Sequence, residues 1–191
     1  GSSTVVSTHC SAIGSGLNII PQDNGSYNIL CGGGSTAGSI TFNPSTLSLT
    51  STASASGNIG AGGCNVLVPS GTYAGKYLVI HGNGTPGTSI FDPSALTFSP
   101  GPSLPSNVGI GASIIPIKYG TNAGKFLLIN GNSTAATSVF DPASGTFSAG
   151  ITLGSAVATG GNSFNISSGI YNGAIAVIHG GITGSISIIF P

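Results

Sequence analysis

The sequence predicts an all-β protein built from four repeats of one four-stranded unit. The first observation is that segment 76–93, KYLVIHGNGTPGTSIFDP, recurs at 125–142 as KFLLINGNSTAATSVFDP. Looser copies occupy 27–44 and 174–191, so the closing prolines repeat every 49 residues. A period of this size is typical of propellers and solenoids. The second observation is that short β-branched runs alternate with Gly, Pro, Asn and Asp clusters without any helical periodicity.

The composition narrows the classes of function. Only three Lys and three Asp are charged, with neither Arg nor Glu, so 3% of residues are charged where about a quarter is usual. Without a basic patch we expect no binding to nucleic acid or to anionic membranes. The apolar runs are too short for a transmembrane helix. Because a low net charge weakens repulsion between copies, we expect self-association, as a homo-oligomer or filament, outside the cytoplasm.

Each repeat is expected to hold four strands, and the repeat that ends at Pro142 shows them best. Its second strand is a continuous apolar run, which indicates a strand that is covered on both faces. Its expected strands are Gly111–Ile117, Lys125–Ile129, Thr137–Phe140 and Gly145–Ser148.

Turn residues separate these strands at recurring places. The hairpin between the first two strands reads GTYAGK at 71–76 and GTNAGK at 120–125, and its glycines permit positive φ. Asp92 and Asp141 each precede a proline at the end of the third strand, where Asp bonds the backbone ahead. We therefore interpret both as turn caps rather than as catalytic acids. Asp23 is interpreted as a single loop residue, and the lysine that ends each hairpin as a solvated side chain.

The chain ends predict how the repeats close. Segment 14–21, GSGLNIIP, matches 109–116, GIGASIIP, and so forms the first strand of the first repeat. Segment Ser3–Ser7 then falls where a fourth strand belongs, whereas the last repeat stops after its third. We predict one domain over residues 1–191, a four-bladed β-propeller whose last blade is closed by the N-terminal strand. Closure removes exposed sheet edges. A two-chain ring or a piece of a longer protein is the alternative.

The repeat resembles the bacterial kelch repeat of galactose-oxidase-like propellers. The likeness lies in an aliphatic strand, a Gly-containing end, a variable loop, S-[IV]-F-D-P and a short strand with an aromatic residue. It implies a kelch-like β-propeller over nearly the whole chain. Galactose oxidase also needs copper, but no set of copper ligands is recognised here, so the resemblance implies the fold without the activity. The sequence departs from the family pattern in two ways. The Gly-Gly doublet of the family is present only at Gly32-Gly33 and Gly180-Gly181, and the usual Trp after the D-P turn is replaced by Leu49, Phe98 and Phe147.

One set of repeat positions carries candidate metal ligands. His81, Asn130 and His179 are in register, with Gly32 as the expected fourth member. Two imidazoles and an amide oxygen are chemically suited to a metal ion. A third imidazole or a carboxylate is missing, however, and the end of a second strand lies away from the axis of a propeller. We therefore interpret these three residues as loop-edge residues whose side chains are hydrogen-bonded to the backbone. A metal site is the alternative interpretation, and no cofactor is predicted.

Catalytic and redox groups are few. With three acids and no Glu, general acid–base catalysis has few candidates, and no G-x-S-x-G nucleophile turn is present. The chain is therefore predicted not to be an enzyme. Cys10, Cys31 and Cys64 fit no metal spacing, which leaves a disulfide among them or three buried thiols.

The functional prediction is a non-catalytic extracellular structural or adhesive protein, such as a subunit of a surface filament, sheath or layer. It rests on the missing acids and bases, and on loops that vary while the strands repeat. The alternative is a carbohydrate-binding or carbohydrate-active propeller. Its candidate ligand residues are Tyr73, Tyr119 and Tyr171, which lie in or beside the first-to-second-strand hairpins. The competing interpretation of these tyrosines is that they cap blade edges.

Overall fold

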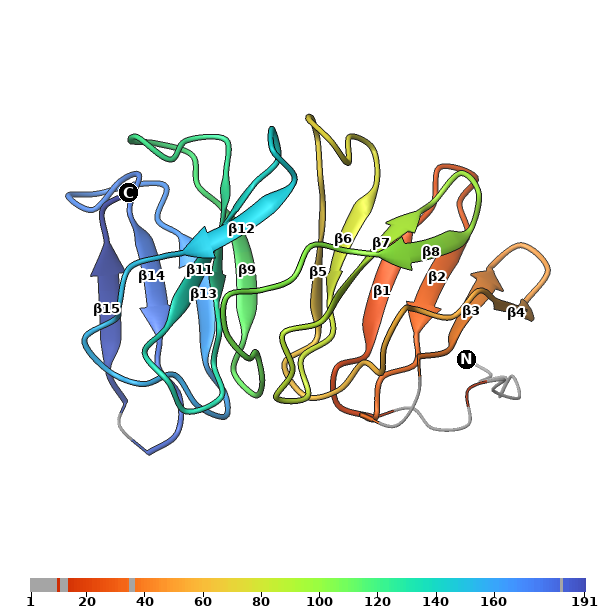
Figure 1. Ribbon diagram of the computed structural model, residues 1–191, viewed down its shortest axis with the longest axis horizontal. Helices are drawn as coiled ribbons and strands as arrows, with labels where there is room; N and C mark the ends of the chain where they lie inside the picture. Colours follow the sequence, from red (N-terminus) through yellow and green to blue (C-terminus); the bar gives the residue numbers. More distant parts are fainter. Residues whose placement is uncertain (1–9, 11–13, 35–36, 183) are drawn as a thin grey trace, which may run out of the picture.

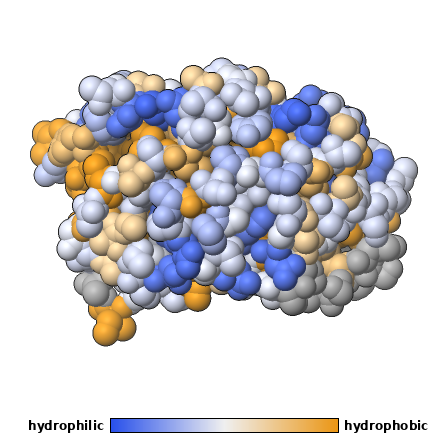
Figure 2. All heavy atoms as spheres, viewed as in Figure 1, coloured by the Kyte–Doolittle hydropathy of each residue, from blue (hydrophilic) through white to orange (hydrophobic). Residues whose placement is uncertain are grey.

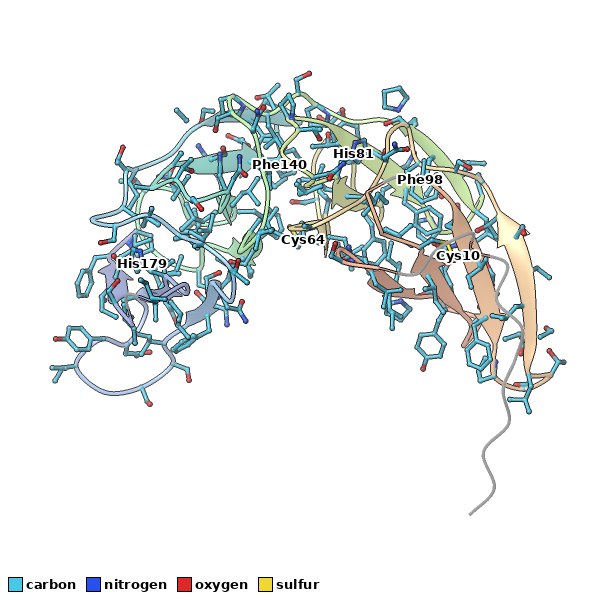
Figure 3. All side chains as sticks on the ribbon, turned by 90° about the horizontal axis from the view of Figure 1, so that it is seen from below. Cys10, Cys64, His81, Phe98, Phe140 and His179 are labelled. Carbon is cyan, nitrogen blue, oxygen red and sulfur yellow. A yellow bond between two sulfur atoms is a disulfide. The ribbon has the colours of Figure 1, made fainter. Side chains whose placement is uncertain are left out.

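The computed structural model describes residues 10, 14–34, 37–182 and 184–191. These residues form fifteen strands and no helix, which confirms the all-β prediction. The strands make four antiparallel sheets that stand side by side along an arc (Figures 1 and 3). Each sheet keeps its strands in sequence order, and we call the sheets blades 1 to 4.

The blades are consecutive in the sequence. Blade 1 holds β1 (Asn18–Pro21), β2 (Tyr27–Leu30), β3 (Ser39–Asn43) and β4 (Ser48–Thr52). Blade 2 holds β5 (Cys64–Leu67), β6 (Tyr77–Ile80), β7 (Thr88–Asp92) and β8 (Thr97–Pro100). Blade 3 holds β9 (Ser113–Pro116), β10 (Phe126–Ile129), β11 (Thr137–Asp141) and β12 (Thr146–Ala149). Blade 4 holds β13 (Asn162–Asn165), β14 (Ile175–Ile178) and β15 (Ile186–Ile189).

The four strands expected in the third repeat are confirmed within two residues at each end. Because every blade is a meander, the turns after the first and third strands share one side of the molecule (Figure 1). We call this side the hairpin face. The turns after the second strand and the connections to the next blade lie on the opposite side.

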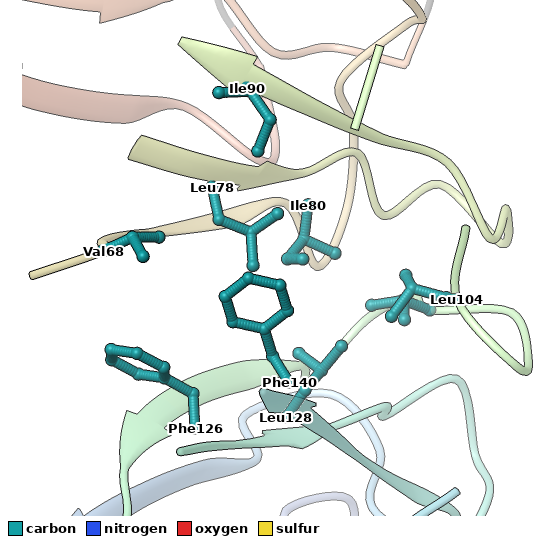
Figure 4. Packing of buried hydrophobic residues seen from close by; sticks show 9 residues of the cluster. Val68, Leu78, Ile80, Ile90, Leu104, Phe126, Leu128 and Phe140 are labelled. Carbon is teal, nitrogen blue, oxygen red and sulfur yellow. The ribbon is translucent and has the colours of Figure 1, made fainter. Parts of the chain in front are cut away.

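The core lies between the blades. Alternate residues of a strand point to opposite faces of its sheet. In β6, Leu78 packs toward blade 3, in a cluster with Phe126 and Phe140 (Figure 4). Its neighbour Val79 packs toward blade 1, in a cluster with Leu30. The second strands β6 and β10 of the inner blades are therefore covered on both faces, as predicted. Each Å² of apolar surface removed from water contributes about 25 cal/mol.

The first strands line the concave side of the arc. Contacts join β5 to β9 and β9 to β13, and Cys64 lies on this side in Figure 3. Side chains bridge neighbouring blades here: Asn65 donates to the Asn18 side chain at 2.9 Å, and the Ser113 and Ser163 hydroxyls lie 2.7 Å apart.

The predicted closed ring is not found in the described residues. Blades 1 and 4 lie at opposite ends of an open arc (Figures 1 and 3). Large side chains such as Phe91 and Phe140 pack between neighbouring sheets. The four sheets together turn through only part of a circle (Figure 3). In the described residues blade 4 has three strands. The strand predicted at Ser3–Ser7 to complete it lies outside the described residues.

Candidate functional site

A buried polar side chain follows the second strand in blades 2, 3 and 4. His81 Nε2 lies 2.7 Å from Ser89 Oγ, eight residues later on the third strand. In blade 4, His179 Nε2 likewise lies 2.7 Å from Ser187 Oγ. In blade 3, Asn130 Oδ1 accepts a hydrogen bond from the Ser138 hydroxyl at 3.0 Å. Each side chain thus ties the second strand of its blade to the third.

The same side chains contact the connection that arrives from the preceding blade. His179 Nδ1 lies 3.2 Å from the Ala156 carbonyl oxygen, and Asn130 Nδ2 donates to Ser106 Oγ. A Cβ on Gly57 would collide with the His81 ring. The preferred interpretation assigned these residues to loop edges with backbone partners. Instead they are buried, and serine hydroxyls supply most of their hydrogen bonds.

The fourth member of this set is Cys31 and not Gly32. The backbone N–H of Cys31 donates to Gly38 as that of His81 donates to Gly87. Gly32 matches Gly82, since both follow the buried residue with φ values of 62° and 67°. The loop after β2 has one residue more than the loop after β6, which shifts the register counted from the closing prolines.

This arrangement has no open catalytic or metal-binding geometry in the described part of the chain. Ser89 is fully buried, and His81 is 5% exposed where it lines a hollow of about 420 Å³ with Asn83, so only the imidazole borders a space open to small molecules. Burial lowers the pKa of His81, which keeps its imidazole neutral at pH 7. No group of three or more His, Cys, Asp or Glu residues in the described ranges is placed to hold a metal ion.

Exposed aromatic residues gather on the hairpin face at the junction of blades 3 and 4. Tyr119 is 55% exposed and lines a hollow of about 280 Å³ together with Asn172 and Phe190. The Tyr171 ring lies 6.1 Å from the Phe190 ring, centroid to centroid. The structure therefore brings two of the three candidate tyrosines to one place. Tyr73 is separate from them, because it packs against the core between blades 2 and 3.

Sequence reasoning missed Phe190 as a member of this aromatic group. It occupies the repeat position that is Asp92 in blade 2 and Asp141 in blade 3. That exchange of a turn-capping carboxylate for an aromatic ring is the signal that identifies it. Phe190 is 68% exposed, so its ring is available to a ligand.

The two aspartates cap their turns as predicted. Asp92 Oδ1 accepts from the Ser94 hydroxyl at 2.6 Å, and Asp141 Oδ1 accepts from the Ala143 N–H at 2.9 Å. These hydrogen bonds, followed by the paired lysine, hold the pKa of both carboxyls below the ordinary value. The lysines were expected to be solvated, but Lys76 and Lys125 pair with these aspartates at 3.1 and 3.2 Å.

The cysteines divide into one bridge and one thiol. Cys10 and Cys31 form a disulfide, with 5.8 Å between their Cα atoms. Cys64 is free and packs against the core between blades 2 and 3. Burial raises the pKa of its thiol to about 12, so it is protonated and unreactive at neutral pH.

The fold is similar to a known structure. A fungal alcohol oxidase of the AA5 family, determined in complex with copper, matches with a TM-score of 0.54 and 12% sequence identity. The match covers 88% of this chain and 50% of the oxidase, so the chain spans about half of its length. No protein-family model and no curated protein matches the sequence. The similarity supports a β-propeller-like, all-β fold, while the kelch repeat itself stays a prediction.

The prediction that the chain is not an enzyme is contradicted by this similarity, because the matching structure is an oxidase. The prediction rested on a shortage of carboxylates, and redox chemistry at a bound metal needs no carboxylate pair. Copper takes His, Cys and carboxylate ligands. The described residues bring no three of these together, so they do not fit a copper centre by themselves.

Proposed function

We propose that this chain is the glycan-binding part of an extracellular β-propeller-like protein, and that sugars bind at the junction of blades 3 and 4. The observation that carries the proposal is the exposed pair of rings, Tyr119 and Phe190, which flank Asn172 on the hairpin face.

The chemistry of sugars suits this surface. One face of a pyranose ring is lined by C–H groups and packs on an aromatic ring, whose face carries partial negative charge. The Asn172 amide can donate to one hydroxyl and accept from another. The hollow of about 280 Å³ is at the small end of ligand sites, which suits one sugar unit of a longer glycan.

An extracellular setting is supported by the Cys10–Cys31 bridge, because disulfides persist in oxidising compartments. Among the described residues there is no helix long and apolar enough to cross a membrane.

A glycan array followed by titration calorimetry tests the proposal. We expect Tyr119→Ala to weaken binding of the best array ligand at least about fivefold, since stacking on one ring contributes about 1–3 kcal/mol. Tyr119→Phe keeps the ring and should bind normally. Tyr27→Ala, an exposed tyrosine of blade 1, is the control. An array without ligands, or full affinity in Tyr119→Ala, would overturn the proposal.

A second candidate is a structural or adhesive surface protein that assembles head to tail. On the outer face of blade 4, Ile186 is 59% exposed, and Figure 2 shows hydrophobic residues gathered over this end. Its neighbour Ile188 is exposed as well, although the equivalent Ile90 of blade 2 is covered by blade 3. The opposite end of the arc exposes Ile19 and Tyr27. Blade 1 of a second copy is therefore the occupant that would repeat the packing between blades.

Light scattering over a range of concentrations tests the second candidate. We expect mass to rise with concentration, and Ile186→Asp to keep the protein monomeric by placing a charge in the apolar contact. Lys118→Asp, a charge change outside this face, is the control. A monomer at every concentration, or assembly unchanged in Ile186→Asp, would contradict head-to-tail association.

A further inference from the structure

A second hollow on the hairpin face lies between blades 1 and 2. Its volume is about 520 Å³, within the range of pockets that bind small molecules. It gathers Asp23, Lys76 and Asp92, which are three of only six charged residues in the chain. Half of the few charges of the chain are therefore found in this one hollow. Uncharged polar groups are added by Gln22, Asn24 and Ser94.

The hollow exists because one hairpin is short. Residues 22–26 connect the first two strands of blade 1, whereas residues 68–76 make this connection in blade 2. The longer hairpin rests on the next blade, where Thr72 N–H donates to the Pro142 carbonyl at 2.9 Å. Gly71 is so close to the same carbonyl that a Cβ would collide with it. The shorter hairpin leaves the corresponding space beside Asp92 open.

One carboxylate in the hollow lies outside the ion pairs of the described residues. Lys76 Nζ and Asp92 Oδ2 neutralise each other across 3.1 Å, in the same way as Lys125 and Asp141 in the next blade. Asp23 is the additional charge. It is exposed and belongs to neither ion pair of the described residues, and its charge acts on the Tyr77 hydroxyl, whose pKa is raised by burial and by Asp23. The hollow therefore carries one net negative charge.

We propose that this hollow binds an amino sugar, a ring that carries a primary ammonium group beside several hydroxyls. Asp23 pairs with the ammonium group, while the Lys76 ammonium group in the same hollow is held by Asp92 at 3.1 Å. The hydroxyls meet Asn24 Nδ2 as a donor and Gln22 Oε1 as an acceptor, since Asn24 Oδ1 already accepts from Ser26 and Gln22 Nε2 already donates to the Ile20 carbonyl. This site differs in place and chemistry from the aromatic junction of blades 3 and 4, and it stands whether or not that junction binds glycans.

Calorimetric titration with two tetrasaccharides tests the proposal. The glucosamine tetramer carries ammonium groups, whereas the N-acetylglucosamine tetramer has the same ring skeleton without the charges. We expect the charged tetramer to bind and the acetylated one to bind up to about fivefold more weakly, the upper range for an exposed ion pair. The difference should shrink at 1 M salt, where charges are screened.

Asp23→Asn is the decisive variant, because Asp23 is exposed and belongs to neither ion pair, so its replacement leaves folding intact. We expect it to bind the charged tetramer about as weakly as the acetylated one. Asp141→Asn makes the same change of net charge in blade 3, outside the hollow, and should bind normally. Equal affinity for the two tetramers, undetectable binding, or unchanged binding in Asp23→Asn would each overturn the proposal. Loss of this binding in Tyr119→Ala would also overturn it, by moving the sugar to the aromatic junction.

Discussion

The junction between blades 1 and 2 and the junction between blades 2 and 3 share one design in their cores and differ at the hairpin face. In both, a phenylalanine of the third strand meets one of the fourth, with ring centroids 4.7 Å apart for Phe91–Phe98 and 5.1 Å apart for Phe140–Phe147. Both also carry the lysine–aspartate pair. Only the second junction has a hairpin seated on the neighbouring turn, at Thr72 and Pro142.

This difference indicates that the strands provide stability and that the hairpins determine which binding sites are present. The repeated strands fill the space between blades and hold the arc together. The long hairpin of blade 2 adds Val68 and Tyr73 to the core, whereas the strands of blade 1 pack without such residues, so hairpin length can differ between blades that share the same core. A hairpin that is four residues shorter opens a polar hollow, and the repeat thereby acquires a site that its neighbour lacks.

The largest effect is expected from the shared cores. Phe91→Ala and Phe140→Ala should each lower the free energy of unfolding by about 3–5 kcal/mol, because both rings are fully buried and leave cavities. Urea unfolding followed by fluorescence or circular dichroism measures both. Two similar losses support equivalent junctions. A loss below about 1 kcal/mol at one junction would break the equivalence.

A somewhat smaller effect is expected from the disulfide that only blade 1 has. Cys31 occupies the place of His81, and its bond to Cys10 closes a loop with a sequence separation of 21 residues. Replacing both cysteines by serine should cost about 3 kcal/mol of unfolding free energy, because the unfolded chain regains the entropy of that loop. The same urea assay measures this loss. Reducing agent should destabilise the wild type and leave the double variant unchanged; an equal response of both would contradict the bridge.

The smallest effect concerns pH and distinguishes blade 2 from blade 3. Burial lowers the pKa of His81 in the folded state, so below about pH 6.5 the unfolded state binds more protons than the folded state. Stability is therefore complete above this pH and falls as the pH drops toward 5. Asn130 takes the equivalent place in blade 3 and does not titrate. The urea midpoint of His81→Asn should fall less between pH 7 and 5 than that of the wild type; an equal fall would exclude His81 as a cause.

Much of the fold could be predicted from the sequence because strands and turns depend on local residue patterns, which recur in each repeat. The strands of blade 3 follow from alternating apolar runs and turn residues, and the Asp141 cap follows from its proline. The pairing of Lys76 with Asp92 could also have been found. Tyr77 lies opposite Phe91 in the sheet, which places residues 76 and 92 side by side, and the same spacing recurs at 125 and 141.

The candidate sites were harder to predict because they depend on contacts between repeats. The assignment of Gly32 as the equivalent of His81 was wrong, because the loop after β2 has one residue more than the loop after β6. Asp23 was interpreted as a single loop residue, because the sequence does not show that the hairpin of blade 1 lies beside the Asp92 turn of blade 2. The open arc was missed for a related reason. Complementary chain ends suggest closure, but the angle between packed sheets decides it (Figure 3).

The most direct measurement is the affinity of the glucosamine tetramer for a variant whose short hairpin has been lengthened. Residues 22–26 are replaced by the sequence of residues 68–76, VPSGTYAGK, which begins and ends at equivalent backbone hydrogen bonds. The new hairpin should seat on Asp92-Pro93 as the native one seats on Asp141-Pro142. We predict that calorimetry detects no binding while the urea midpoint stays close to that of the wild type. Undiminished binding to the stable variant would contradict the conclusion that hairpin length creates the site.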